Sequence, residues 1–165
     1  MIQIFVTGGT FDKDYDYITG KLKFRETHVN DMLARGRCTV PFDVRTLMMI
    51  DSLEMTEADR NNIAHNVTRA TSDKIVITHG TDTMTDTARF LAERAIANKT
   101  IVIMGAMVPY AFGTSSDGFF NLGSALSFVQ VLDPGVYIVM NGRAFQWDEV
   151  RKNRQTGYFE AVTPA

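Results

Sequence analysis

Hydrophobic residues along the chain gather in short runs that have the length and composition of buried strands. Residues 74–78 show the pattern most clearly, because their middle is uniformly apolar, as in a strand covered on both faces of a parallel sheet. On this basis we predict strands over residues 2–6, 43–50, 74–78, 100–105 and 135–140.

Segments of helical character alternate with these strands. Thr56 is followed three residues later by Asp59, as in a capping box, and Ile63, Val67 and Ala70 recur along one helical face. We predict helices over residues 56–70, 83–97 and 119–131, and a polar surface loop over residues 11–28. This alternation indicates an α/β fold, an open and mostly parallel sheet with helices on both faces, in three layers like flavodoxin or Rossmann domains.

The composition fits one globular domain over residues 1–165, because 45% of the residues are hydrophobic and 22% are charged. A net charge of −2 leaves no basic surplus to neutralise phosphates, so nucleic acid is not an expected partner. No apolar run approaches the roughly 20 residues that cross a bilayer, so no membrane partner is expected either.

Two features bear on the cellular compartment. Cys38 is the single cysteine, so it cannot form an intrachain disulfide, and in the strand-like run with Thr39 and Val40 it is expected to pack as a small apolar residue. Residues 1–6 lack the basic leader and cleavage site of a signal peptide. A cytoplasmic protein is therefore the simplest expectation.

Polar or glycine-bearing clusters directly follow four of the predicted strands. In open α/β sheets, ligands bind beyond the carboxyl ends of the strands, and parallel strands bring these ends to one edge. We therefore expect one site built from the segments Thr7–Thr10, Asp51–Ser52, His79–Thr83 and Gly105–Met107.

Thr10 is the first candidate for chemistry. A threonine hydroxyl is a weak nucleophile that needs a base or a polarising group, and Gly8 and Gly9 allow a sharp turn with close substrate approach. Taken alone, such a segment is more often a plain turn. A nucleotide cradle is disfavoured, because neither G-x-G-x-x-G nor G-K-[ST] is present.

The segment His79–Thr83 offers two hydroxyls and a carboxylate at a strand-to-helix turn, whose amides could hold a carboxylate or an oxyanion. The simpler interpretation is a helix cap formed by Asp82 or Thr83. His79 is expected to be a structural hydrogen-bonding histidine. No metal is expected, since the histidines His28, His65 and His79 lack ligand spacing.

Other candidates depend on how the chain folds back. Lys152 belongs to the basic run Arg151–Arg154 and is solvated by default. It gains a role in proton transfer only if the fold returns it to Thr81 and Asp82.

Two pairs of residues leave their alternatives open. Tyr15 and Tyr17 either cover the site as a lid or are surface aromatics. Asp51 and Ser52 either recognise the charged groups of a substrate or merely begin a turn.

The combination of motifs resembles the bacterial L-asparaginases over nearly the whole chain. The two threonine motifs, each after a strand and in the right order, are the most specific part. The matching segments are Thr7–Thr10, Ile77–Met84, Met104–Met107, Asp117–Leu122, Val139–Asn141 and Val150–Lys152.

The resemblance implies an L-asparagine amidohydrolase that needs no cofactor. Thr10 would attack the side-chain amide to give an acyl-enzyme and ammonia, and water would then release aspartate. Thr81, Asp82 and Lys152 would form a second hydroxyl-centred triad. L-Glutamine is the alternative substrate.

The resemblance also implies the substrate contacts. Tyr15 would hydrogen-bond the nucleophile from a mobile lid, although Tyr17 stays an alternative because Tyr17–Gly20 resembles the lid too. Asp82 would bind the substrate α-ammonium beside Thr81, and Ser52, next to Asp51, would help to hold the α-carboxylate.

Two departures from the family pattern change the expectations. The family often has glutamine after the serine, where this chain has Leu53, so one polar substrate contact is absent. Most members also carry a C-terminal domain that completes the neighbouring subunit's site with an acid, whereas this chain stops at Ala165. It is therefore either a fragment or, as Met1 and the ordinary ending favour, a short-chain form that works as a homo-oligomer, a dimer or a tetramer.

Two alternative functions remain. An ammonia-supplying subunit of an amidotransferase is disfavoured by the lack of an appended domain or basic surface. A non-catalytic ligand-binding or assembly module is disfavoured because every catalytic residue type is present.

Overall fold

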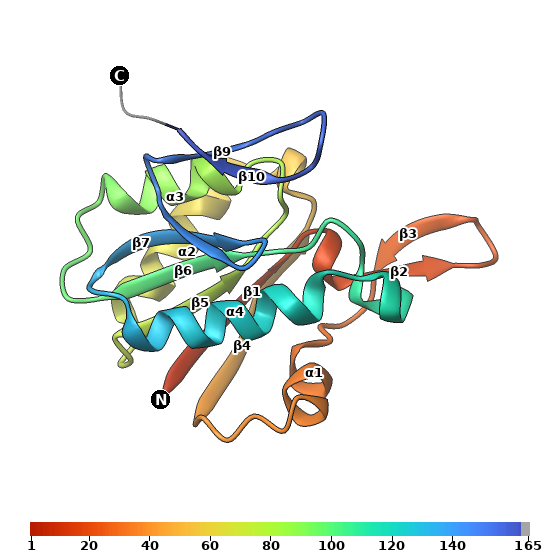
Figure 1. Cartoon of the computed structure of the whole chain (residues 1–165), viewed down its shortest axis with the longest axis horizontal. Helices are drawn as coiled ribbons and strands as arrows, with labels where there is room; N and C mark the ends of the chain where they lie inside the picture. The colour runs from red at the N-terminus through yellow and green to blue at the C-terminus, as the bar shows by residue number, and fades with distance from the viewer. Residues whose placement is uncertain (163–165) are drawn as a thin grey trace.

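A six-stranded sheet forms the centre of the computed structural model, which describes residues 1–162 (Figure 1). Its strand order is β4-β1-β5-β6-β7-β8, and only β8 runs antiparallel to its neighbour. The predicted mostly parallel α/β fold is confirmed. The strands are β1 (Ile2–Gly8), β4 (Phe42–Ile50), β5 (Lys74–Thr78), β6 (Thr100–Met104), β7 (Gly135–Met140) and β8 (Arg143–Gln146).

Helices cover both faces of this sheet and give the predicted three layers (Figure 1). Successive side chains of a strand point to opposite faces. Ile75 and Ile77 therefore pack with α2 (Glu57–Arg69) and α3 (Met84–Ala92), whereas Val76 packs with α1 (Val29–Arg35) and α4 (Gly118–Val131). Burial on both faces explains the uniformly apolar runs in the sequence.

The predicted ends of the helices are confirmed at two helices and wrong at the third. Thr56 and Asp59 form the capping box at the start of α2, and α4 begins one residue before its predicted start. The helix predicted over residues 83–97 ends at Ala92, because Ala95 and Asn98 have left-handed φ values of 47° and 59°. A right-handed helix cannot continue through such residues.

The surface loop predicted over residues 11–28 is wrong. A short 3-10 helix, η1 (Thr10–Asp12), is followed by an antiparallel hairpin of β2 (Lys13–Asp16) and β3 (Lys21–Phe24). Phe11 and Asp12 are buried beneath it. The further unpredicted elements are α1, β8, β9 (Val150–Lys152), β10 (Phe159–Ala161), η2 (Ser52–Glu54) and η3 (Tyr110–Ser115).

Cys38 lies outside any strand, so its strand-like prediction is wrong. Its side chain is half-buried against the core that α1 and α4 cover, as expected of a small apolar residue. Within residues 1–162, no helix has both the length and the apolar character needed to cross a membrane.

Candidate active site

Glycines bring the ends of β1, β4 and β5 into direct contact. Gly8 and Gly9 have positive φ values of 95° and 76°, which let the chain turn sharply after β1. A Cβ on Gly9 would lie 2.5 Å from Gly80 Cα, and a Cβ on Gly80 would lie 2.5 Å from Ser52 Oγ. The two threonine motifs and Ser52 are therefore held together, as the shared edge of the sheet predicted.

Thr10 lies at the first position of η1, half-buried, directly after the contact between Gly9 and Gly80. The backbone of Gly9 is fixed on its other side, because its amide donates to Ile50 O over 2.9 Å. Within residues 1–162 the Thr10 hydroxyl forms no hydrogen bond. The nucleophile candidate thus sits on a rigid turn with its hydroxyl unengaged.

Lys152 is returned to the second threonine motif. Its Nζ donates to Thr81 Oγ1 over 2.9 Å and to Asp82 Oδ1 over 2.8 Å, and its side chain is only 12% exposed. The default expectation of a solvated lysine is therefore wrong. Arg154 adds a longer contact of 3.4 Å to the same Asp82 oxygen. A hydroxyl, an amine and a carboxylate in mutual contact can pass protons among themselves.

Hydrogen bonds through two asparagines hold the strand that carries Lys152 in this position. Asn121 of α4 donates to Gly105 O and accepts from the amide of Asn141. Asn141, with φ of 55°, in turn accepts from the amide of Phe159 in β10. Because Phe159 is the register partner of Lys152 across β9 and β10, these bonds link the lysine to the central sheet.

His79 is fully buried and structural, as predicted. Its Nδ1 lies 2.8 Å from Gly80 O and its Nε2 lies 2.8 Å from Thr87 Oγ1. A carbonyl can only accept, so Nδ1 carries the proton and Nε2 accepts from Thr87. Burial lowers the pKa of His79 to about 4, which keeps the ring neutral.

The helix-cap interpretation of the second motif is wrong. Thr83 occupies the N-cap position of α3 but makes no side-chain cap hydrogen bond. Its hydroxyl donates instead to Ser52 O over 2.9 Å and accepts from Arg60 over 3.1 Å. Asp82 is engaged by Lys152 rather than by the helix. Both polar groups thus tie the site together instead of capping α3.

Asp51 and Ser52 differ in their surroundings. Asp51 caps η2 by accepting from the amide of Leu53, and it forms an ion pair of 2.6 Å with Lys13. The hydrogen bond from Lys13 lowers the pKa of Asp51. Ser52 is buried against Gly80, whereas Leu53 is 68% exposed. Asp51 therefore does begin a turn, and Ser52 faces the second motif.

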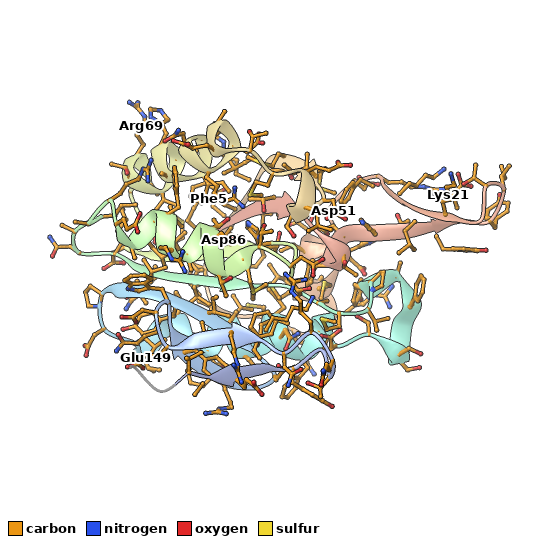
Figure 2. All side chains as sticks on the ribbon, turned by 90° about the horizontal axis from the view of Figure 1, so that it is seen from above. Phe5, Lys21, Asp51, Arg69, Asp86 and Glu149 are labelled. Atoms are coloured by element: carbon orange, nitrogen blue, oxygen red, sulfur yellow. The ribbon has the colours of Figure 1, made fainter. Side chains whose placement is uncertain are left out.

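Tyr15 and Tyr17 lie on the hairpin of β2 and β3, which projects from the body of the protein (Figure 2). In Figure 2, Lys21 lies toward the outer end of the hairpin and Asp51 lies where it leaves the body. Tyr15 is 52% exposed and Tyr17 is 79% exposed. A Cβ on Gly20 would lie 3.9 Å from Tyr15 Oη, so the Tyr15 hydroxyl rests over the hairpin turn.

Several residues near the site were not predicted from the sequence, namely Asp12, Lys13, His28, Arg60 and Arg154. For Lys13 a weak signal was present next to it, because Asp14 to Tyr17 alternate between acidic and aromatic residues, as in a short strand. Within residues 1–162, no three His, Cys, Asp or Glu side chains gather as a metal site.

Comparisons with known proteins point to one family. The family model described as "Asparaginase, N-terminal" matches residues 1–163. L-asparaginase 2 of Escherichia coli is 33% identical over 171 residues, which cover 94% of this chain and 47% of that protein. The glutaminase-asparaginase of Acinetobacter glutaminasificans is 33% identical over 112 residues, covering 64% of this chain and 34% of that protein.

Solved structures agree as well. L-asparaginase I of Vibrio cholerae superposes with a TM-score of 0.83 at 25% identity, covering 99% of this chain and 52% of that one. The thermostable L-asparaginase of Thermococcus kodakarensis gives the same TM-score and coverage at 24% identity, which supports the fold alone. The chain thus spans about half the length of these relatives. It belongs to the asparaginase family and matches its N-terminal part.

Proposed function

We propose that the chain is an L-asparagine amidohydrolase in which residues 1–165 form a single catalytic domain of the N-terminal type. The observation that carries this proposal is the contact of Lys152 with Thr81 and Asp82, beside the turn that bears Thr10. The relatives that match over this region are named asparaginases and glutaminase-asparaginases. L-Glutamine is therefore the second substrate to test.

In the proposed reaction, Thr10 Oγ forms a bond to the side-chain amide carbon of the substrate and gives up its proton. The amide nitrogen takes up a proton and leaves as ammonia, so that an ester to Thr10 remains. Water then attacks the ester carbon, which releases aspartate and restores the hydroxyl of Thr10. Thr81, Asp82 and Lys152 support these steps by holding and moving protons.

The substrate-binding roles are also part of the proposal. Asp82 binds the α-ammonium group, and the hydroxyls of Ser52 and Thr81 hold the remaining polar atoms. Asp51 would repel the α-carboxylate on its own, but its ion pair with Lys13 neutralises that charge.

The hairpin would act as the lid of this site. Tyr15 acts from the hairpin on the nucleophile, with Tyr17 as the alternative. Both tyrosines are exposed, so each is free to contact a substrate when the hairpin lies over the site.

We propose further that the protein is a cytoplasmic homo-oligomer, a dimer or a tetramer. A related structure is titled a probable cytoplasmic L-asparaginase from Campylobacter jejuni. Light scattering on the active protein tests the oligomeric state, and an active monomer would contradict the proposed oligomer.

Ammonia release from asparagine and glutamine tests the proposed activity. We expect Thr10→Ala to lower the rate by at least about a thousandfold, as expected for loss of a nucleophile. The matched control is Thr39→Ala, an exposed threonine before β4 and outside the hairpin, which should stay within about twofold of the parent.

Each contrary outcome removes a different part of the proposal. Release that survives Thr10→Ala would remove Thr10 as the nucleophile. No release from either amide by the parent protein would favour a ligand-binding module.

A further inference from the structure

The hairpin of β2 and β3 needs an anchor. It has four residues in each strand and projects from the body (Figure 2). A two-stranded hairpin alone is at best marginally stable in water. Inside it, Asp16 pairs with Lys23 over 2.8 Å, but this contact does not reach the body of the protein. The position of the hairpin is therefore decided at its base.

Three consecutive residues tie that base to two neighbouring segments, Thr27–His28 and Asp51. Asp12 Oδ1 accepts from Thr27 Oγ1 and from the amide of His28, both over 3.0 Å. Lys13 pairs with Asp51 at the end of β4, and Asp14 Oδ1 lies 3.2 Å from His28 Nε2. Asp12 precedes the hairpin, whereas Thr27 and His28 follow it. Its carboxylate therefore joins the two ends of the hairpin to each other.

Asp12 lowers the stability of the folded protein at this position. It has no exposed surface, and its second oxygen, Oδ2, is buried without a hydrogen-bond partner within residues 1–162. A buried acceptor left without a partner costs about 1–3 kcal/mol. Burial also raises the pKa of Asp12 to about 6. Groups that cost stability close to a reacting residue are often kept for function.

We propose that Asp12 is a positioning residue, whose carboxylate clips Thr27 and His28 to η1 and so fixes the hairpin relative to Thr10. This rests on the proposed amidohydrolase function. Because alternate side chains of a strand share a face, Tyr15 lies on the same face as Lys13, which contacts Asp51. The clip thus sets the direction from which Tyr15 approaches the strand ends when the hairpin moves.

Hydrogen exchange at the amides of residues 13–24, measured together with kcat and KM for asparagine, tests the clip. Asp12→Ala removes both accepted bonds. We expect exchange in the hairpin to rise at least about tenfold and kcat/KM to fall about 10- to 100-fold, the loss expected from a displaced group. Asp12→Asn keeps an acceptor at the Oδ1 position and should stay within about threefold of the parent in both measurements.

Two further variants complete the experiment. Thr27→Val removes one of the two donors and leaves Asp12 in place, so it should give an intermediate effect even if Asp12→Ala fails to fold. Lys23→Met is the matched control, because it removes the amine of the ion pair with Asp16 inside the hairpin and leaves the base intact. It should leave exchange at the base and kcat/KM within about threefold.

Unchanged hairpin exchange in both Asp12→Ala and Thr27→Val would overturn the clip. A folded Asp12→Asn protein as impaired as Asp12→Ala would do the same, because the negative charge would then matter rather than the accepted bonds. Hydrogen exchange does not depend on turnover. Absence of amide hydrolysis in the parent would therefore refute the proposed function while the exchange comparison still decides about Asp12.

Discussion

The strand ends and the hairpin differ in how they are held. At the strand ends, the backbone of Gly9 packs directly against the backbone of Gly80. Side chains also link one strand end to the next, as where the Thr83 hydroxyl donates to Ser52 O. The hairpin is attached through its base, while its turn around Tyr17 stands in solvent. The groups proposed for the chemistry are thus fixed before substrate arrives, and the groups proposed to cover it are left adjustable.

The largest effect on activity is expected at the strand ends, where Lys152 contacts Thr81 and Asp82. Lys152→Met removes the amine that holds Thr81 and Asp82 together, and we expect ammonia release to fall about 10²- to 10⁴-fold, the range for a group that transfers protons. Steady-state kinetics measure this. Arg151→Met on the same strand is the control, because Arg151 is exposed and pairs with Glu160, and it should keep nearly full activity. Full activity of the Lys152 variant would remove the lysine from the mechanism.

The same substitution in both regions should have unequal effects on stability. Gly9→Ala would drive a Cβ into Gly80 at a positive φ, so we expect a loss of about 3–5 kcal/mol in the free energy of unfolding. Gly20→Ala in the hairpin also has a positive φ, 69°, but its nearest neighbour is 3.9 Å away. It should cost only about 1–2 kcal/mol. Urea unfolding measures the free energy of unfolding of both variants. Equal losses would contradict the expected difference between the strand ends and the hairpin.

The two regions should also respond to pH in opposite directions. Burial raises the pKa of Asp12 to about 6 from 3.8, so the stability gained from its protonation is full below pH 3.8 and lost as pH rises through 6. Burial lowers the pKa of His79 to about 4 from 6.5, so its contribution is present above pH 6.5 and lost as pH falls toward 4. Each effect amounts to about 3 kcal/mol.

Unfolding free energies between pH 4 and pH 7 check both signs. Relative to the parent, Asp12→Asn should gain stability as the pH rises through this range. His79→Gln should instead lose its deficit relative to the parent as the pH falls. Stability differences that do not change with pH in either variant would contradict the assigned burial effects.

The sequence was sufficient for the rigid region and insufficient for the hairpin, and the reason is physical. Strands such as β5 are covered on both faces, so their apolar runs identify them and the motifs at their ends. In β2 the residues Lys13 to Asp16 are mostly charged, because contacts between charges hold the hairpin instead of a core. Composition therefore concealed its strand character.

The return of Lys152 to Thr81 was likewise beyond the sequence. It depends on β9 and β10, which have three residues each and carry no strong strand signal. The bonds that hold them run through Asn121 and Asn141, which are far apart in the chain. Only the family resemblance linked this lysine to the second threonine motif.

The position of β1 in the sheet has a consequence for a cut chain. β1 lies between β4 and β5, and all seven of its residues are buried. The exposed hairpin turn near Ile18 is the kind of place where proteases nick a folded protein. A nick there would leave Thr10 on a short N-terminal piece that hydrogen bonds on both sides still hold in the sheet. The protein would then run as two bands on a denaturing gel and as one particle in solution.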